Sequence, residues 1–437
     1  MSWRVCRRLG GLAAAAALGG AGLHLGPVRP VEAGSYNWIE LRPAKSPPPT
    51  RLGAMAYDPA TQQLILFGGE QSEADGNYVY SNSTWSWNGS TWTELSPSAS
   101  PSAREGAAMA YDASTKELLL FGGYNPDDNE LNDTWEWTGK DWTALSPAES
   151  PSPRVGAAMA YDTETSQLLL FGGFGESGLY DNDTWVWAGT SWDPLSPASA
   201  PDARYDVAMA YDTHSRQLIL FGGYDGGGSL GALDDTWSWS GSDWEPLSPA
   251  AWPPARYSAC VAYDPATADI VLFGGTNFDD WLSDTWTWTG SDWEPAKPAK
   301  VPTARDDASC ALAGSQFVMF GGQGEATLFD DDTWTYGGAV PSAPKDLTAT
   351  GEDAKVDLSW KAPASQGGSA ITGYDVFDST KSGEEGTKPI NSTPLSSGAR
   401  SFTKTGFAKG VRIYFVVKAV NAAGLGAASN QVSAVPT

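Results

Sequence analysis

The sequence predicts an all-β chain, made of a six-bladed β-propeller followed by a small β-sandwich. Three observations carry this prediction. A Gly-Gly pair returns at positions 68, 122, 172, 222, 274 and 321, with spacings of 54, 50, 50, 52 and 47 residues. Each copy brings the same short apolar and aromatic phrases, and a period near 50 built of short strands is typical of propeller blades. After residue 344 the repeat stops and a different strand pattern begins.

Each phrase of one repeat, residues 154–197, has the pattern of one strand in a four-stranded meander. Residues 156–160 are Gly-Ala-Ala-Met-Ala, whose small side chains suit the innermost strand near the propeller axis. Residues 168–171 form a continuous apolar run, as expected for a strand buried on both faces. Trp185 and Trp187 alternate with polar residues on the third strand, and Trp192 lies on the outer strand. The turn at residues 161–163 joins the first two strands.

This pattern resembles the kelch repeat of the galactose oxidase-like propellers. An arginine opens the first strand, Gly-Gly closes the second, and aromatic residues mark the third and fourth. The resemblance covers residues 36–338 and implies a kelch-type propeller. It does not specify a function, because kelch propellers include binding modules and several unrelated enzymes.

The two ends of the repeat region predict how the ring closes. Residues 36–42 match the outer-strand phrase at residues 141–147, although they precede the first blade. The sixth repeat stops after its third-strand phrase, at residues 333–336, and lacks an outer strand. We therefore expect residues 36–42 to be the outermost strand of the sixth blade, which leaves no open blade at the seam.

The segments outside the repeat predict an exported protein with a second domain. Residues 1–33 have the pattern of an export signal, with three arginines before an Ala/Leu/Gly-rich run, and the alternative is a membrane anchor. No later segment is long and apolar enough to span a bilayer. Residues 339–344 are a linker rich in Gly, Ser and Pro. The strand phrases of residues 345–437, with Trp360 as the core aromatic residue, resemble an immunoglobulin-like fibronectin type III domain.

Composition excludes some partners. The full chain has a formal charge of −25, and residues 34–344 alone carry about −30. Nucleic acid is excluded as a partner, because a polyanion would be repelled. We expect a secreted, extracellular monomer, without membrane insertion of the mature chain.

The two cysteines of the mature chain, Cys260 and Cys310, are predicted on the inner strands of neighbouring blades. They are either a disulfide or two small buried apolar residues. Cys260 lies four residues after its repeat arginine and Cys310 five after its own. On this count the two side chains lie on opposite strand faces, unless a bulge intervenes.

Arginines at one end of the inner strands have two interpretations. They are Arg51, Arg104, Arg154, Arg204, Arg256 and Arg305. They either form a cationic ring for an anionic ligand or pair with the aspartate before each Thr-Trp, at 133, 183, 235, 284 and 332. We favour the pairing, because both partners recur with the repeat. The first blade has Ser83 at the place of the aspartate.

Metal chemistry is limited by the scarcity of histidine. The mature chain has one histidine, His214, so the two-His, two-Tyr copper site of galactose oxidase-type enzymes cannot be assembled. We expect no cofactor, with Ca²⁺ as the one possible ion. Its weak candidate ligands are loop aspartates, Asp127, Asp128, Asp279 and Asp280, which we interpret as solvated loop residues.

Aromatic residues in the loops after Gly-Gly predict the ligand-binding face. These loops share the end of the propeller at which the arginines lie, here called the top face, and variable loops on a rigid scaffold commonly carry function. The aromatic residues in or beside the top-face loops, which include the Pro-rich loops between blades, are Tyr78, Tyr124, Tyr180, Tyr224, Trp252 and Trp281. We predict an extracellular, non-catalytic binding or adhesion protein that recognises a carbohydrate or a protein. The alternative is a secreted lyase, hydrolase or mutarotase acting on an acidic sugar, whose carboxylate the arginines would hold.

Overall fold

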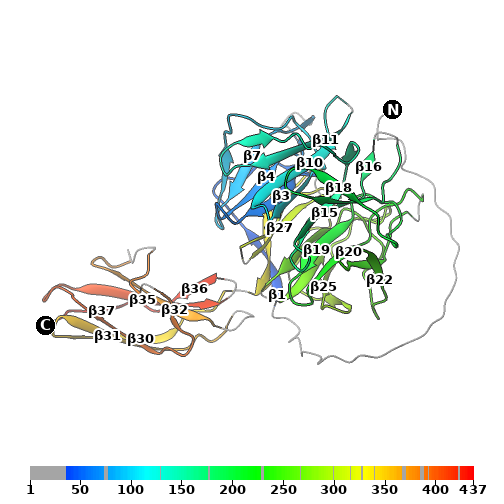
Figure 1. Cartoon of the computed structure of the whole chain (residues 1–437). Coiled ribbons are helices and arrows are strands. Elements are labelled where there is room, and N and C mark those ends of the chain that lie inside the picture. Colours follow the sequence, from blue (N-terminus) through cyan, green and yellow to red (C-terminus); the bar gives the residue numbers. More distant parts are fainter. Residues whose placement is uncertain are drawn as a thin grey trace.

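Described residues of the computed structural model form strands, turns and loops, and no helix (Figure 1). They are residues 36–437 except 73–76, 128, 176–177, 228–230, 266, 299, 315, 326–327, 339, 367–370, 384–387, 392 and 422–423. Within these ranges, no helix is long and apolar enough to cross a membrane. The predicted export signal lies outside the described residues.

Six four-stranded antiparallel sheets make up the propeller. From inner to outer strand, blade 1 has β3 (Ala54–Asp58), β4 (Gln63–Phe67), β7 (Thr84–Trp87) and β8 (Trp92–Leu95), and blade 2 has β9 (Ala108–Asp112), β10 (Glu117–Tyr124), β11 (Glu130–Trp137) and β12 (Trp142–Ala144). Blade 3 has β14 (Ala158–Asp162), β15 (Gln167–Phe171), β17 (Thr184–Trp187) and β18 (Trp192–Leu195), and blade 4 has β19 (Ala208–Asp212), β20 (Gln217–Phe221), β21 (Thr236–Trp239) and β22 (Trp244–Leu247). Blade 5 has β23 (Cys260–Asp264), β24 (Asp269–Phe273), β25 (Thr285–Trp288) and β26 (Trp293–Ala296).

Blade 6 combines the two ends of the propeller sequence. Its strands are β27 (Ser309–Ala313), β28 (Gln316–Phe320), β29 (Thr333–Gly338) and, outermost, β1 (Tyr36–Leu41). β1 is antiparallel to β29, from the pair Tyr36↔Gly338 to the pair Leu41↔Thr333. The first strand therefore completes the last blade, and it ends one residue before the expected limit of 42.

The core lies between the blades, as expected for sheets stacked around an axis. Second strands such as Leu168 to Phe171 are fully buried. Each outer-strand tryptophan also donates its indole N–H to the threonine of the Thr-Trp phrase on the third strand of the preceding blade, at 2.9 to 3.1 Å. The six donors are Trp38, Trp92, Trp142, Trp192, Trp244 and Trp293. The repeated Thr-Trp phrase thus fastens each blade to its neighbour.

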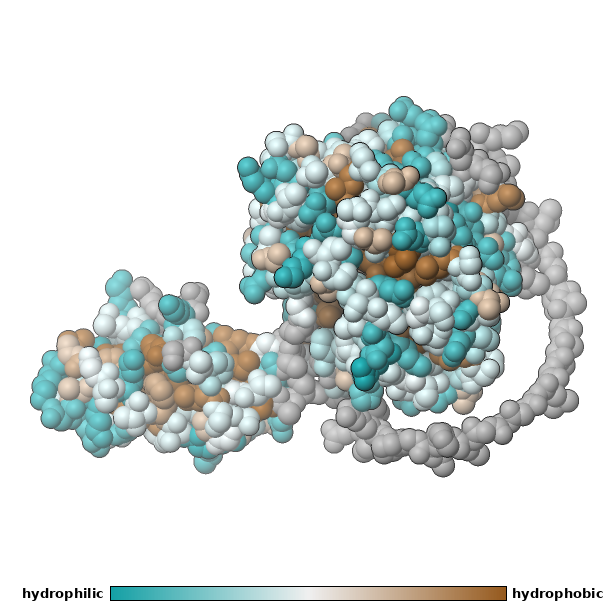
Figure 2. Space-filling model, viewed as in Figure 1, coloured by the Kyte–Doolittle hydropathy of each residue, from teal (hydrophilic) through white to brown (hydrophobic). Residues whose placement is uncertain are grey.

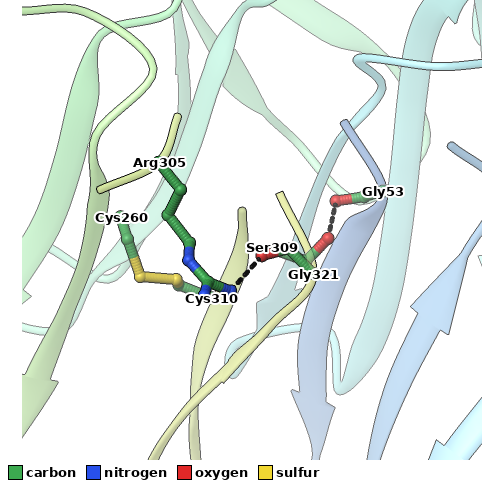
Figure 3. The surroundings of a disulfide bond; sticks show 6 residues. All are labelled: Gly53, Cys260, Arg305, Ser309, Cys310 and Gly321. Carbon is green, nitrogen blue, oxygen red and sulfur yellow. Dashed lines mark hydrogen bonds between the residues drawn. A yellow bond between two sulfur atoms is a disulfide. The ribbon is translucent and has the colours of Figure 1, made fainter. Parts of the chain in front are cut away.

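Cys260 and Cys310 form a disulfide between β23 and β27, with Cα atoms 5.6 Å apart (Figure 3). In the sequence, the positions of the two cysteines on different strand faces argued against this bond. The stacking of neighbouring blades requires those different faces. Each blade presents one face to the preceding blade and the opposite face to the next, so residues of opposite parity meet. Ala54 and Met109 show the same relation in the core between blades 1 and 2.

Blade 6 is also linked to blade 1 at the same level. Ser309 Oγ donates a hydrogen bond of 2.8 Å to the carbonyl of Gly53 (Figure 3). The disulfide fixes the opposite face of this blade to blade 5. The blade that closes the ring is therefore held to both neighbours by its innermost strand.

Short strands cap the top face of the propeller. They are β2 (Thr50–Arg51), β5 (Glu70–Ser72), β6 (Tyr78–Tyr80), β13 (Arg154–Val155) and β16 (Phe174–Gly175). They arise because residues before the inner strand pair with residues after Gly-Gly, as Arg51 pairs with Glu70. This pairing brings the loops of each blade toward the axis.

The C-terminal domain is a β-sandwich of two sheets. One sheet has β30 (Lys345–Glu352), β31 (Lys355–Lys361) and β34 (Ser401–Thr405), and the other has β33 (Leu395–Ser396), β32 (Gly373–Ser379), β35 (Ile413–Asn421) and β36 (Gly424–Ala428), with β37 (Val432–Ala434) paired to β35. Trp360 and Tyr374 lie in one buried core with Val417. The sandwich thus has an apolar core of its own, separate from the cores of the propeller.

Candidate functional site

Five of the repeat arginines are buried in their own blades. Each makes a two-pronged ion pair with the aspartate before Thr-Trp and donates to the carbonyl of the first glycine in Gly-Gly. The pairs are Arg104–Asp133, Arg154–Asp183, Arg204–Asp235, Arg256–Asp284 and Arg305–Asp332. The arginines are about 1% exposed, so this is the pairing favoured by the repeat, and it leaves them little access to a ligand.

Arg51 does not occupy the position of the other five. Ala54 and Ala108 hold equivalent places opposite Phe67 and Phe121, which aligns Thr50 with Arg104. Arg51 is therefore shifted by one residue toward the axis. The sequence carries this signal, because Arg51 lies 17 residues before Gly68 whereas four of the others lie 18 before their glycine. The expectation that Arg51 opens its strand like the others is corrected here.

The displaced Arg51 lies among acceptors on the top face. Its Nη2 is 2.6 Å from Glu70 Oε2, and its Nη1 donates to Gln323 Oε1 at 2.8 Å. Asp307 Oδ2 is 3.6 Å from Nη1. Burial lowers the pKa of Arg51, but the neighbouring carboxylates Asp307 and Glu70 raise that pKa by more than burial lowers it. The guanidinium therefore stays charged.

Six residues, here called the axial ring, surround the propeller axis just inside the arginines. They are Leu52, Gly106, Gly156, Asp206, Ser258 and Asp307, and the backbone N–H of each donates to the carbonyl of the preceding member at 2.8 to 3.2 Å. All six have φ between 51° and 66°. Glycine adopts this left-handed region readily, aspartate adopts it more readily than most residues with a side chain, and leucine and serine are strained there. Only two members are glycine, so four positions retain a side chain despite the strain.

Four acidic residues from three blades, here called the carboxyl cluster, gather at this ring. They are Glu105, Asp206, Asp306 and Asp307. Burial raises the pKa of Glu105 to about 8, and Glu70 and Asp307 add to the shift against the opposing effect of Arg51. Burial and the neighbouring Asp307 likewise raise the pKa of Asp306 to about 8, although the indole of Trp281 approaches this carboxyl group and opposes the shift. Burial, with Asp307 next, also raises the pKa of Asp206 well above its usual range.

Aromatic rings from blades 3, 4 and 5, here called the tyrosine arc, form the other side of the site. They are Phe174, Tyr180, Tyr205, Tyr224, Tyr257 and Phe278, in one connected set with ring centroids 5.0 to 6.3 Å apart. Tyr205 and Tyr257 directly precede Asp206 and Ser258 in the chain. The top face therefore carries a charged half at blades 6, 1 and 2 and an aromatic half at blades 3 to 5, and the two halves meet at Asp206.

The aromatic residues predicted from the sequence lie in four different places. Tyr180 and Tyr224 belong to the tyrosine arc, while Tyr124 packs on Tyr80 and Tyr78 packs on Phe329, both beside the charged half. Trp281 lies near Asp306. Trp252 is 52% exposed, beside a shallow depression of about 230 Å³ that Asp234 and Leu247 also line, on the outer part of the blades.

Sequence reasoning missed the carboxyl cluster and two tyrosines of the arc. A comparison of the residues after each repeat arginine gives a signal for them. The pairs are Glu-Gly, Val-Gly, Tyr-Asp, Tyr-Ser and Asp-Asp at residues 105–106, 155–156, 205–206, 257–258 and 306–307. Two repeats have glycine at the second position of the pair, which suits the positive φ there. The other three repeats have Asp206, Ser258 and Asp307 at that position, which indicates a role for their side chains.

No metal site appears in the part of the chain that the structure describes. None of its groups of three or more His, Cys, Asp or Glu residues could hold an ion. Backbone N–H groups of Asp127, Asp279 and Asp280 donate to nearby asparagine side chains in local turns. Asp128, the fourth weak calcium candidate, lies outside the described residues.

Comparisons with known proteins identify the C-terminal domain and go no further. The family model of the fibronectin type III domain matches residues 342–435. Among solved structures, the one titled "Structure of YjhT" covers 67% of this chain and 95% of its own, with 14% sequence identity and a TM-score of 0.49. A search of curated proteins gives no match. The chain thus combines a six-bladed β-propeller with a fibronectin type III domain, and its function has to be argued from the site.

Proposed function

We propose that the protein is an extracellular, non-catalytic binding protein that takes a carbohydrate at the axis of the propeller's top face. The observation that carries the proposal is the connected tyrosine arc, which lies directly against the carboxyl cluster at Asp206. Flat aromatic rings stack on the apolar faces of sugars, and carboxylates accept hydrogen bonds from sugar hydroxyls. A fibronectin type III domain at residues 342–435 accords with a binding or adhesion role.

The side of the propeller that Figure 2 shows is mainly hydrophilic, with apolar residues in separate small areas. That surface favours a polar ligand. A broad protein interface would bring a larger apolar centre than these separate areas provide. A carbohydrate, held by a few rings and several hydrogen bonds, fits the described residues better than a protein partner does.

A glycan array followed by titration calorimetry tests this proposal. Tyr257→Ala should weaken binding of the best glycan by about 10-fold or more, since stacking on a tyrosine ring contributes on the order of 1–2 kcal/mol. Trp252→Ala removes an exposed ring away from the axis and serves as the matched control, with unchanged affinity expected. Loss of binding in Trp252→Ala alone would move the site to the outer depression, and an array without any bound glycan would remove the proposal.

A glycan-processing enzyme is the second candidate, because two carboxyl groups have a pKa near 8. A carboxyl group that holds its proton at neutral pH can act as a general acid, and an ionised neighbour can act as the base. An acidic sugar is disfavoured as its substrate, since five arginines are buried in ion pairs and Arg51 already faces Glu70 and Asp307. Measured turnover that Glu105→Gln abolishes, with binding retained, would favour this candidate over the binding protein.

A further inference from the structure

We propose that the shallow depression beside Trp252 is a docking point for an arginine side chain that a partner protein presents on a short basic segment. The depression lies on the outer part of the blades, away from the axial ring, so the inference is independent of the carbohydrate proposed at the axis. Three observations carry it: two neighbouring departures from the repeat, the open ring of Trp252 and the charge around that ring.

Trp252 stands where the repeat has a small side chain. Four residues before the repeat arginine, two other loops between blades have Ser100 and Ser150, and the remaining loops have Ser, Ala or Val. Ser100 Oγ donates to the carbonyl of Asn82, just before the third strand, at 3.3 Å. Ser150 Oγ donates in the same way to Asn132 at 3.1 Å. A tryptophan cannot make this contact, so the ring at position 252 does not serve to join the loop to its blade.

The same depression contains a second departure from the repeat. Two residues before the threonine of Thr-Trp, blades 1 to 3 have asparagine, and blade 4 has Asp234. Asp234 and Trp252 line one depression of about 230 Å³, together with Ser248 and Pro249. Packing alone would keep the repeated residues in this blade as in the others. Two departures that meet in one depression therefore indicate a binding role.

The ring of Trp252 is open to a partner. It is 52% exposed, and among the described residues its indole has no hydrogen-bond, ring or cation contact. Pro253 and Pro254 follow it directly, and proline limits the conformations of a loop. A partner therefore meets an aromatic surface that is already held in place, which lowers the entropic cost of binding.

The charge around the ring selects a cation. Asp234 is exposed and makes no ion pair with the described residues. Its neighbour Asp235 is held by Arg204, with Nη1 and Oδ1 2.5 Å apart. The depression therefore keeps one free carboxylate beside the indole. An anionic group would be repelled by Asp234 and by the propeller, whose formal charge is about −30.

The blades of this propeller already place cations over tryptophan rings. Lys45 Nζ lies 4.7 Å from the ring centroid of Trp85, and Lys300 Nζ lies 4.6 Å from that of Trp334. Tryptophan attracts a cation to its face more strongly than the other aromatic residues do. At Trp252 the described residues supply no such cation, so a partner would have to supply it.

A guanidinium group fits this pair of groups better than an ammonium group does. It is planar, so it can lie flat on the indole and still direct two N–H groups at Asp234. The depression is shallow, so it holds the end of one side chain, whereas a free small molecule commonly buries most of its surface when bound. Leu247 and Pro249 at its edge offer apolar contact to the chain on either side of the arginine.

Two peptides test the inference: acetyl-Gly-Arg-Gly-amide and its citrulline counterpart, which keeps the planar group and lacks the charge. Ligand-observed NMR titrations with the full chain at pH 7 measure both affinities. The arginine peptide should bind about 10-fold more tightly, because a cation–π contact and an ion pair each contribute a few-fold. Asp234→Asn should reduce this preference to about 3-fold, and Trp252→Ser should weaken the arginine peptide by about 5-fold.

Matched variants separate recognition from the general attraction of a cation to an acidic protein. Trp252→Ser introduces the residue that two other loops have at this position, so the blade should keep its fold. Asp193→Asn removes an exposed carboxylate from β18 in blade 3 and should leave both affinities unchanged. Equal losses in Asp193→Asn and Asp234→Asn, or equal binding of the two peptides, would overturn the inference.

A neutral sugar is the rival occupant of the depression. The β-1,4 tetramer of glucose serves as the probe, because it can stack on an indole and carries no charge. If this tetramer binds and Trp252→Ser abolishes that binding, the depression is a sugar site and the inference is wrong. The carbohydrate site proposed at the axis is tested separately by Tyr257→Ala, so either proposal can fail while the other stands.

Discussion

Asp206 occupies a place where the backbone alone would select glycine. Its φ of 51° and its ring hydrogen bonds match those of Gly156 in the preceding blade. The left-handed conformation costs most residues with a side chain, alanine included, about 1–2 kcal/mol, and it costs aspartate less. Residues retained against such strain tend to serve function at the expense of stability. Mutations in the axial ring can therefore separate what ligand binding requires from what stability requires.

We predict that Asp206→Gly stabilises the propeller while it weakens ligand binding. Asp206→Ala removes the same carboxylate but keeps the backbone strain, so the glycine variant should exceed the alanine variant by about 1 kcal/mol in free energy of unfolding. Urea unfolding of the two variants and the wild type measures this difference. Equal stability of the glycine and alanine variants would show that the ring is not strained at this position.

The five arginine–aspartate pairs could be predicted from the sequence, because both partners recur at fixed places in every repeat. The one-residue shift of Arg51 shows in the sequence only as its spacing of 17 residues to Gly68, and the pairing of Ala54 with Phe67 establishes it. The carboxyl cluster escaped for a related reason. Its residues lie 100 positions or so apart, at Glu105, Asp206 and Asp307, and only the closed ring brings them together.

At the scale of elements, the sequence predicted the blades, because each strand has a phrase of its own. It misjudged one relation between blades. The parity of Cys260 and Cys310 appeared to separate them, yet stacked sheets around an axis contact one another through opposite faces. Within one sheet, side chains that meet lie on the same face. Between neighbouring blades, side chains that meet lie on opposite faces of their own strands.

β1 is the element on which closure of the ring depends. Its Trp38 is 1% exposed, donates to Thr285 of blade 5 at 2.9 Å and packs on Phe273 and Phe317. Deletion of residues 1–41 should therefore destabilise the propeller by at least about 3–5 kcal/mol, the usual effect of losing one buried tryptophan. Deletion of residues 1–34 retains β1 and is the control. Thermal melts of both truncated chains decide the matter, and identical melting temperatures would contradict the role given to β1.

At the scale of the whole molecule, the acidic propeller separates its carboxyl groups into two kinds. Burial raises the pKa of Asp133 and Asp183, but hydrogen bonds and charge from Arg104 and Arg154 outweigh it, and both pKa values lie below the usual range. These aspartates add stability that is lost as the pH falls through their folded pKa, in the acid range. The carboxyl cluster acts in the opposite direction and in a different pH window.

We predict that the propeller without ligand loses stability as the pH rises from about 5 to 8. Glu105 has a pKa of about 8 in the folded protein against an ordinary value of 4.5, and Asp306 about 8 against 3.8. Between these limits the unfolded chain has released protons that the folded chain still holds, so the free energy of unfolding falls with pH. Glu105→Gln keeps a neutral side chain at every pH and should flatten the fall by on the order of 1–3 kcal/mol.

Urea unfolding at pH 5 and pH 8, followed by tryptophan fluorescence, measures this effect in the propeller, because Trp360 is the one tryptophan of the fibronectin type III domain. Glu245→Gln, exposed on β22, is the matched control and should keep the wild-type slope. Stability that rises between pH 5 and 8 would mean that burial does not raise the pKa of Glu105 and Asp306, and it would contradict this prediction.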